Sequence, residues 1–189
     1  AIRDVYKRQA ERRGLPNIHS TVEAAKAMID EKNQAVLEKH GVLTRVESTS
    51  RYEITLENYN KIINIEALTT LEMAKRQIIP AVIQYTTSLA ESINTIKATG
   101  INVDISVQTE SLTEISTLLA SLNKNVSLLE KAVEKADNFE GDIFDLGMMY
   151  RYEVFEQMNT LRADADKLET LVDEEFWPLP TYSDMLFNV

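Results

Sequence analysis

Two stretches in the second half of the chain carry apolar residues at a heptad spacing. In the first, steps of three and four residues alternate through Leu112, Ile115, Leu119, Leu122, Val126, Leu129, Val133 and Ala136. In the second, the same steps run through Val154, Met158, Leu161, Ala165, Leu168 and Val172. This spacing places an apolar stripe along one face of a helix, so we predict long helices over about 109–137 and 142–175. Because only a short turn joins them, the two stripes are expected to pack antiparallel.

A third long helix is predicted over about 66–99, where apolar residues recur at a period near 3.6. Pro80 lies inside it, and a proline there removes one backbone hydrogen bond and clashes with the carbonyl four residues earlier. We therefore predict a kink near 76–80, with a break into two helices as the alternative. Gly100 ends this helix, and residues 101–107 alternate apolar and polar. A lone strand would have no partner, which favours an extended linker there.

Two capping boxes predict shorter helices in the N-terminal part of the chain. Ser20 and Glu23 have the spacing at which each side chain bonds a free amide of the first helical turn, and so do Thr44 and Glu47. His40 fits the end of a helix, with Gly41 just after it. The fold class predicted is therefore all-α.

The expected architecture is an antiparallel helical bundle with three long helices, one of them kinked at Pro80, and shorter N-terminal helices. We expect a single helical domain over 10–189. With only five glycines and four prolines, the chain has too few turn residues for a β-sandwich or barrel.

The last segment, 176–189, is aromatic and proline-rich, and it differs from the helices before it. A solvated tail would forgo about 1.5–3 kcal/mol of burial for each large apolar side chain. We therefore expect a docked tail, packed on its own bundle or on a neighbouring subunit. The predicted docking residues are Trp177, Pro178, Leu179, Tyr182, Met185, Leu186 and Phe187.

Charge and composition narrow the chemistry. A net charge of −10 disfavours binding to nucleic acid or to an anionic membrane, and no apolar run reaches the length of a membrane span. With no cysteine, the chain has no thiolate nucleophile or ligand, and His19 and His40 lie in loop or helix-end positions. Carboxylates such as Asp164, Asp166 and Glu169 are expected on a solvated face. We predict no catalytic, cofactor-binding or metal-binding residue in this chain.

The start of the chain is unusual, because it begins at Ala1 and residues 4–9 spell a peptide that resembles one reading frame of a sequencing adaptor. We therefore interpret residues 1–9 as an adaptor scar or unrelated leader, and expect the natural polypeptide to continue upstream. An ordinary polar helical segment is the alternative.

Short motifs in order along the chain resemble the C-terminal region of type III glutamine synthetases, the long bacterial class. The residues that carry the resemblance are Arg13-Gly14-Leu15-Pro16-Asn17, His40-Gly41-Val42, Ser50-Arg51-Tyr52-Glu53 through Leu56-Glu57, Asn64-Ile65-Glu66-Ala67-Leu68, Glu72-Met73-Ala74-Lys75, Ile79-Pro80-Ala81, Trp177-Pro178-Leu179-Pro180-Thr181-Tyr182 and Met185-Leu186-Phe187. They extend from about residue 11 to the end.

The resemblance implies a parent enzyme that ligates ammonia to glutamate with ATP, uses Mg²⁺ or Mn²⁺, and forms a large homo-oligomer in the cytoplasm. It also implies that the metal and phosphate ligands lie upstream, in the catalytic core, and that this segment is a helical extension. Its partners would then be that core and neighbouring subunits. The alternative function is a stand-alone coiled-coil adaptor or signalling domain built on the stripe at 112–136, and a small helical enzyme is a third.

Overall fold

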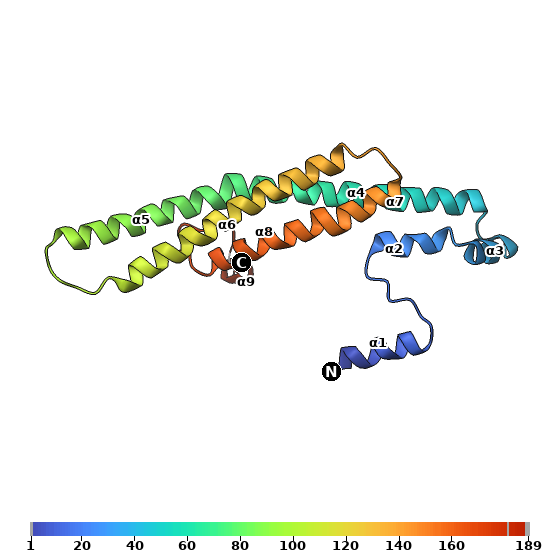
Figure 1. Ribbon diagram of the computed structural model, residues 1–189, viewed down its shortest axis with the longest axis horizontal. Coiled ribbons are helices and arrows are strands. Elements are labelled where there is room, and N and C mark those ends of the chain that lie inside the picture. The colour runs from blue at the N-terminus through green and yellow to red at the C-terminus, as the bar shows by residue number, and fades with distance from the viewer. Residues whose placement is uncertain (1, 181, 188–189) are drawn as a thin grey trace. The chain divides into compact units, whose positions relative to one another are not determined.

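The computed structural model describes residues 2–180 and 182–187, and of residues 2–5, 7, 182, 183 and 187 it describes the backbone alone. Every regular element in these residues is helical, which confirms the all-α class (Figure 1). The α-helices are α1 Ile2–Arg12, α2 Thr21–Ala25, α3 Glu31–Lys39, α4 Arg45–Met73, α5 Ile79–Ala98, α6 Ser106–Asp137, α7 Ile143–Met149, α8 Phe155–Glu169 and α9 Tyr182–Phe187. A 3₁₀ turn, η1 Lys26–Met28, follows α2, and π-helical turns form η2 Ala74–Ile78 and η3 Tyr150–Val154.

The first long helix is much longer than the sequence analysis expected. We predicted a helix over 66–99 and a separate one beginning near Thr44, but α4, η2 and α5 follow one another without interruption from Arg45 to Ala98. The β-branched residues around 62–65 weaken helix propensity, yet Ile63 is 6% exposed and Ala67 fully buried. Packing of this face overrides the local preference.

Pro80 does not break this helix. The N–H of Ile79 bonds the carbonyl of Ala74, five residues earlier, so a π-helical turn precedes the proline. The Pro80 ring would disrupt a backbone hydrogen bond of a regular α-helical turn. The wider π turn before it accommodates this disruption without ending the helix. The alternative of a break into two helices is therefore wrong, since the helix continues through Pro80 with a π turn at Ala74–Ile78, and the kink itself stays a prediction.

The other two long helices also differ at their ends from the prediction. Helix α6 begins at Ser106 rather than 109, because the Asp104 carboxylate accepts a hydrogen bond of 2.9 Å from the Ser106 N–H and starts the helix inside the expected linker 101–107. Helix α8 ends at Glu169 rather than 175, because the Asp173 side chain accepts from the Glu175 N–H at 2.9 Å and starts a turn.

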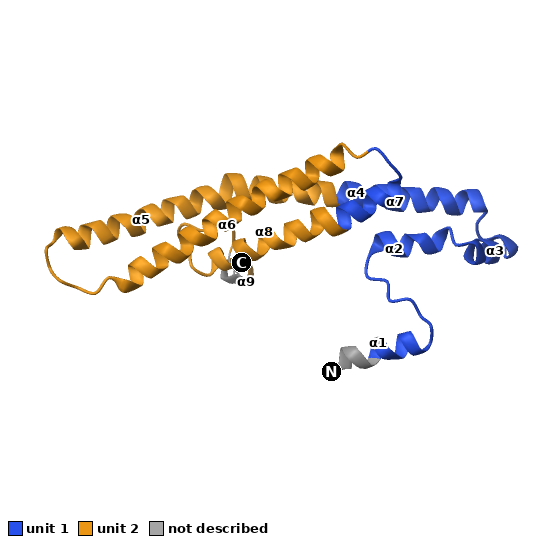
Figure 2. Cartoon of the chain, in the orientation of Figure 1, with its two compact units in different colours: residues 1–62, 140–151 blue, residues 63–139, 152–189 orange. Residues whose placement is uncertain are grey.

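The chain groups into two compact units (Figure 2). Unit 1 comprises residues 1–62 and 140–151, and unit 2 comprises residues 63–139 and 152–189. Helix α4 contributes residues to both. Because this grouping reflects proximity and not independent folding, the single domain expected over 10–189 stays a prediction.

In unit 2, α6 packs lengthwise against both α5 and α8 (Figure 1). The predicted stripes face inward: Leu122, Leu129 and Leu168 are each 0% exposed. Burial of such side chains contributes about 1.5–3 kcal/mol each. An ion pair between Lys75 and Glu130 also joins η2 to α6.

Unit 1 is built from short helices with well-formed ends. Its core consists of Val22, Ala25, Tyr52 and Leu56, with Tyr59, Ile143, Phe144 and Met148 packed around them. Both predicted capping boxes are present, since the Glu23 N–H donates to Ser20 Oγ at 3.1 Å and the Glu47 N–H donates to Thr44 Oγ1 at 3.2 Å.

Helix α3 ends at Lys39 with His40 as its C-cap, as predicted, and Gly41 follows at φ +64°. The Val42 N–H reaches back to the Leu37 carbonyl at 2.9 Å, which is a Schellman ending. Residues 2–9, within the proposed scar, belong to α1, and the side chains of Arg8 and Gln9 are exposed. Whether these residues are a scar stays a prediction.

Candidate functional site

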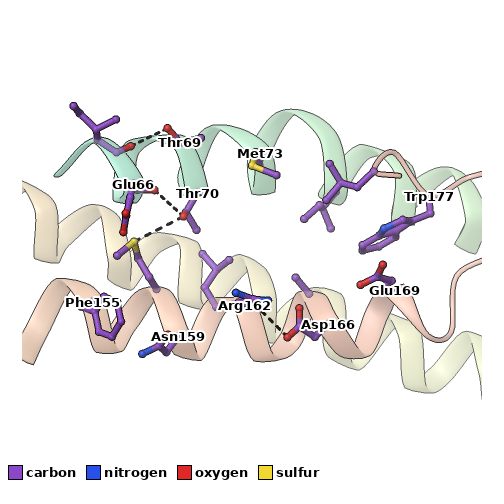
Figure 3. A pocket seen from close by; sticks show the side chains of 16 residues that line it. Glu66, Thr69, Thr70, Met73, Phe155, Asn159, Arg162, Asp166, Glu169 and Trp177 are labelled. Atoms are coloured by element: carbon purple, nitrogen blue, oxygen red, sulfur yellow. Dashed lines mark hydrogen bonds and ion pairs between the residues drawn. The ribbon is translucent and has the colours of Figure 1, made fainter. Parts of the chain in front are cut away.

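A groove of about 610 Å³ lies within unit 2, between α4–η2 on one side and α8 on the other, with the start of the tail at one end (Figure 3). We call it the Trp177 groove. Its apolar lining comprises Ile65, Met73 and Ile78 from α4–η2, Phe155, Met158, Leu161 and Ala165 from α8, and Trp177 and Leu179 from the tail.

The threonines of the groove add little polarity to its wall. The hydroxyl of Thr69 donates to the Ile65 carbonyl at 2.8 Å, and that of Thr70 donates to the Glu66 carbonyl at 2.8 Å. Both hydroxyls are thus committed to the backbone four residues earlier. The Thr70 hydroxyl also lies 3.8 Å from Met158 Sδ, within reach of a weak hydrogen bond. The walls are therefore mainly apolar.

Charged side chains form the edge of the groove. Arg162 Nε lies 3.5 Å from Asp166 Oδ2, and both side chains are more than half exposed, so this pair contributes little. Neither Glu66 nor Glu169 forms an ion pair with any side chain that the structure describes. The edge therefore carries a net negative charge, with Glu169 facing Trp177 (Figure 3).

Trp177 is the only tryptophan of the chain and closes one end of the groove. Its side chain is 8% exposed, and its Nε1 has no hydrogen-bond partner among the described residues. A buried donor without a partner costs about 1–3 kcal/mol. Its neighbour Phe176 packs on Tyr85 of α5 with ring centroids 5.5 Å apart. The beginning of the tail thus packs against the helices of its own unit, unit 2.

The structure separates the predicted docking residues into two groups. Trp177 and Leu179 line the groove, whereas Pro178 between them is exposed. Met185 and Leu186 lie on α9 and are 60% and 72% exposed. The side chains of Tyr182 and Phe187 lie outside the described residues. A role of this set in docking to another surface stays a prediction.

A polar cluster between α6 and α8 was missed by the sequence analysis, which assigned Asp164 to a solvated face. Its carboxylate accepts hydrogen bonds from Ser121 Oγ at 2.7 Å and Asn125 Nδ2 at 2.8 Å. Gln157 Nε2 donates to Asn125 Oδ1 at 3.3 Å, and Asn125 is 9% exposed. Because Asp164 directly precedes the stripe residue Ala165, its position beside the stripe was the available signal.

Other candidate chemistry is sparse in the part of the chain that the structure describes. Burial raises the pKa of Tyr52, and the nearby charges of Asp142 and Asp145 raise it further. No three His, Asp or Glu side chains of the described residues are grouped so that they could hold a metal ion. His19 and His40 are exposed. Among the described helices, none has the length and hydropathy of a membrane span.

Comparisons with known proteins give a family. A family model described as glutamine synthetase C-terminal domain matches residues 3–97, a range that takes in most of the proposed scar. A glutamine synthetase of Butyrivibrio fibrisolvens is 30% identical over 186 residues, which cover 98% of this chain and 26% of that protein. A type-3 glutamine synthetase of Dictyostelium discoideum is 31% identical over 186 residues, 96% of this chain and 25% of that protein.

A glutamine synthetase of Bacteroides fragilis is 28% identical over 187 residues, 97% of this chain and 26% of that protein. The chain thus spans about a quarter of the length of these relatives. The resemblance inferred from the ordered motifs is confirmed: this chain belongs to the glutamine synthetase C-terminal domain family.

Proposed function

We propose that this chain is a non-catalytic assembly domain of a cytoplasmic glutamine synthetase, and that it packs against the enzyme's own catalytic core and neighbouring subunits of a homo-oligomer. The observation that carries the proposal is the family match of a chain that corresponds to only a quarter of its relatives. A stand-alone adaptor is disfavoured, because nearly the whole chain aligns with part of a longer enzyme.

The parent reaction in this proposal is ATP-dependent ligation of ammonia to glutamate, with Mg²⁺ or Mn²⁺ at the active site. The ligands of ATP and metal would lie outside this chain. The described residues do not fit a metal site, since they bring no three suitable side chains together.

The exposed part of the tail supports an assembly contact. Met185 and Leu186 are adjacent on α9 and both are mostly exposed. Large apolar side chains that cluster on a surface are typical of protein interfaces. Burial of both against a core or a neighbouring subunit would recover part of the free energy that their exposure forgoes.

The proposal is tested in the full-length enzyme that contains this chain. The double variant Met185→Ser/Leu186→Ser is expected to weaken assembly at least tenfold in the apparent dissociation constant, measured by light scattering over a dilution series. A matched control, Ile101→Ser/Val103→Ser, alters two exposed apolar residues in a loop of the same unit and should leave assembly unchanged. An unchanged oligomer in the α9 variant, and in a truncation before Phe176, would refute the assembly role.

Absence of catalysis is tested with the 189-residue chain alone. It is expected to give no ATP-dependent formation of glutamine from glutamate and ammonia above the buffer rate. Measurable activity that copurifies with the chain would contradict this part of the proposal.

A further inference from the structure

The part of α4 that belongs to unit 1 has apolar side chains on two opposite faces. One face packs Tyr52 and Leu56 into the core of the unit. The other carries Val46, Ile54 and Ile62, which are 79%, 53% and 54% exposed. At about 100° per residue, Ile54 lies about 160° from Leu56 around the helix axis. Apolar residues on opposite sides are typical of a helix that is covered on both, so the exposed face is a candidate interaction surface.

This exposed face includes polar and charged positions as well. The residues of 46–62 that lie within about 80° of Ile54, all of them exposed, are Val46, Glu47, Ser50, Arg51, Ile54, Glu57, Asn58, Lys61 and Ile62. We call them the outer face of α4. A groove of about 630 Å³ lies over the first half of this face, with Met28 of η1 beside the helix. The whole face is about 24 Å long at 1.5 Å per residue, which suits a second helix packed lengthwise.

The outer face of α4 is complementary to itself about Ile54. Counted from Ile54, the positions that correspond are Val46 and Ile62 at eight residues, Glu47 and Lys61 at seven, Ser50 and Asn58 at four, and Arg51 and Glu57 at three. Apolar positions thus correspond to apolar ones, and each charge corresponds to one of opposite sign. An interface between two copies related by a two-fold axis needs this property, because every contact in it occurs twice with the roles exchanged. A partner of unrelated sequence does not need it.

An antiparallel pair of α4 helices with the two-fold axis at Ile54 brings complementary positions together. Ile54 then packs on Ile54 of the second copy. Glu47 and Lys61 each lie about 20° from the centre line, so Glu47 faces Lys61 of the second copy, and the same ion pair forms again at the other end. Farther from the centre line, Arg51 lies beside Asn58 of the second copy and can donate to its amide oxygen.

Contacts within one copy leave both charges able to form this ion pair. Lys61 Nζ lies 3.0 Å from Glu57 Oε2, but an ammonium group has three donors. The capping box uses Oε2 of Glu47, which accepts from the Thr44 amide and hydroxyl at 2.8 Å each, and Oε1 is the second acceptor of the carboxylate. One lysine donor and one carboxylate oxygen therefore remain for a contact between copies.

We propose that the outer face of α4 binds a second copy of this chain, as an antiparallel helix pair centred on Ile54. The apolar contacts are few and the face is short, so the pair belongs to the weak class of interfaces, with a dissociation constant above about 1 μM in the isolated chain. The inference rests on the proposed assembly role only in taking the second copy to be a neighbouring subunit.

Single cysteines test the position of the two-fold axis, because the chain contains no cysteine of its own. In Ile54→Cys the two thiols face each other across the axis, and we expect a disulfide-linked dimer in a glutathione buffer. In Ser50→Cys the two positions are about 12 Å apart along the pair, beyond the reach of about 7 Å between Cα atoms, and at least tenfold less dimer should form. A gel run without reductant measures both. A parallel pair or random collision would instead link both variants equally.

Charge reversal tests the ion pairs, with sedimentation equilibrium giving the dissociation constant and circular dichroism verifying the fold. Lys61→Glu places like charges opposite each other twice and should weaken self-association at least tenfold. Lys124→Glu makes the same change in net charge at an exposed site of α6 and should leave it unchanged. Glu47→Lys should also weaken self-association. An equimolar mixture of Lys61→Glu and Glu47→Lys chains should restore it, since each copy then supplies the charge that the other needs.

Four results would overturn the inference. These are a chain that stays monomeric up to about 1 mM, equal cross-linking of Ile54→Cys and Ser50→Cys, self-association that Lys61→Glu leaves unchanged, and a mixture that does not restore association. A monomeric chain would assign the outer face to another part of the enzyme. The light-scattering test of assembly changes α9 in the full-length enzyme and leaves α4 intact, so the two proposals fail separately.

Discussion

Units 1 and 2 are both helical, yet they are stabilised in different ways. Unit 2 buries long stripes on α6 and α8 together with one face of α4–α5, whereas unit 1 closes short helices over a small centre. Among the buried apolar side chains that the structure describes, those of unit 1 are Val22, Ala25, Tyr52, Leu56 and Tyr150, and all the others belong to unit 2.

Local hydrogen bonds contribute a larger share of the stability in unit 1 than in unit 2. The capping boxes at Ser20 and Thr44 and the Schellman ending at Gly41 fix the ends of α2, α4 and α3. Exposed apolar side chains occur in both units, for example Val46 at 79% in unit 1 and Leu186 at 72% in unit 2, so the units differ in what they bury and not in what they expose. Because hydrophobic burial supplies most of the stability of a helical fold, we expect unit 1 to open at lower free energy than unit 2.

The largest expected effect comes from the seam of unit 2. Leu129→Ala removes a fully buried side chain of α6 and should lower the free energy of unfolding by about 2–5 kcal/mol. Leu128→Ala, one residue away and 41% exposed, should change it by less than about 0.5 kcal/mol. Urea denaturation of both variants gives the difference. Equal losses would mean that the inward stripe does not dominate the stability of unit 2.

The same stripes explain how much of the fold could be predicted from sequence. Heptad spacing predicted α6 and α8, and capping boxes predicted the starts of α2 and α4, because these signals depend only on residues near one another in the chain. The continuity of α4 through Ile63 could not be predicted, since it depends on burial against other elements. The π turn η3 was not predicted either, because no proline near it marks an irregular helix and its formation also depends on packing against other elements.

A smaller effect is expected from the polar cluster between α6 and α8. Asp164→Ala leaves Ser121 and Asn125 without their acceptor and should cost about 1–3 kcal/mol. Asp166→Ala, two residues along the same helix, removes only an exposed pair with Arg162 and should cost less than about 1 kcal/mol. Thermal denaturation of the two variants side by side measures this. A cost for Asp166→Ala as large as for Asp164→Ala would contradict a structural role of the cluster.

The candidate site was less predictable than the fold. The sequence indicated that Trp177 and Leu179 would be buried near the end of the chain, but it did not indicate against what. The groove exists because residues about ninety positions apart, such as Thr70 and Met158, face each other. Pairings of that kind are set by tertiary packing, which one sequence without relatives does not reveal.

Gly147 offers a way to perturb unit 1 alone. A Cβ at this position would lie 3.0 Å from Val22 Cγ1 and 3.3 Å from Asn60 Oδ1, both in buried residues. Overpacking costs about 1–3 kcal/mol and outweighs the gain in helix propensity of up to about 1 kcal/mol, so Gly147→Ala should destabilise unit 1 by about 1 kcal/mol. Hydrogen exchange should accelerate at the amides of α2 and remain unchanged at those of α6. Equal acceleration in both helices would mean that the units open together.

The smallest expected effect concerns pH and the capping box of α4. The hydrogen bond from the Thr44 backbone amide, then that from the Thr44 hydroxyl, hold the pKa of Glu47 below its ordinary value of 4.5. A carboxylate with a lowered pKa stabilises the fold above the unfolded value, and this contribution is lost as the pH falls from about 4.5 through the folded value. Glu47→Gln keeps an acceptor for the Thr44 amide but does not titrate, so it should reduce the loss of melting temperature between about pH 6 and pH 3.

The counterpart in unit 2 is Asp104, whose pKa is lowered by the backbone amide of Ser106, and Asp104→Asn serves as the matched variant. If unit 1 opens first, amides at the start of α4 should respond to Glu47→Gln more than amides at the start of α6 respond to Asp104→Asn, because a cap weighs more where less apolar surface is buried. A larger response at α6 would reverse the ranking of the two units.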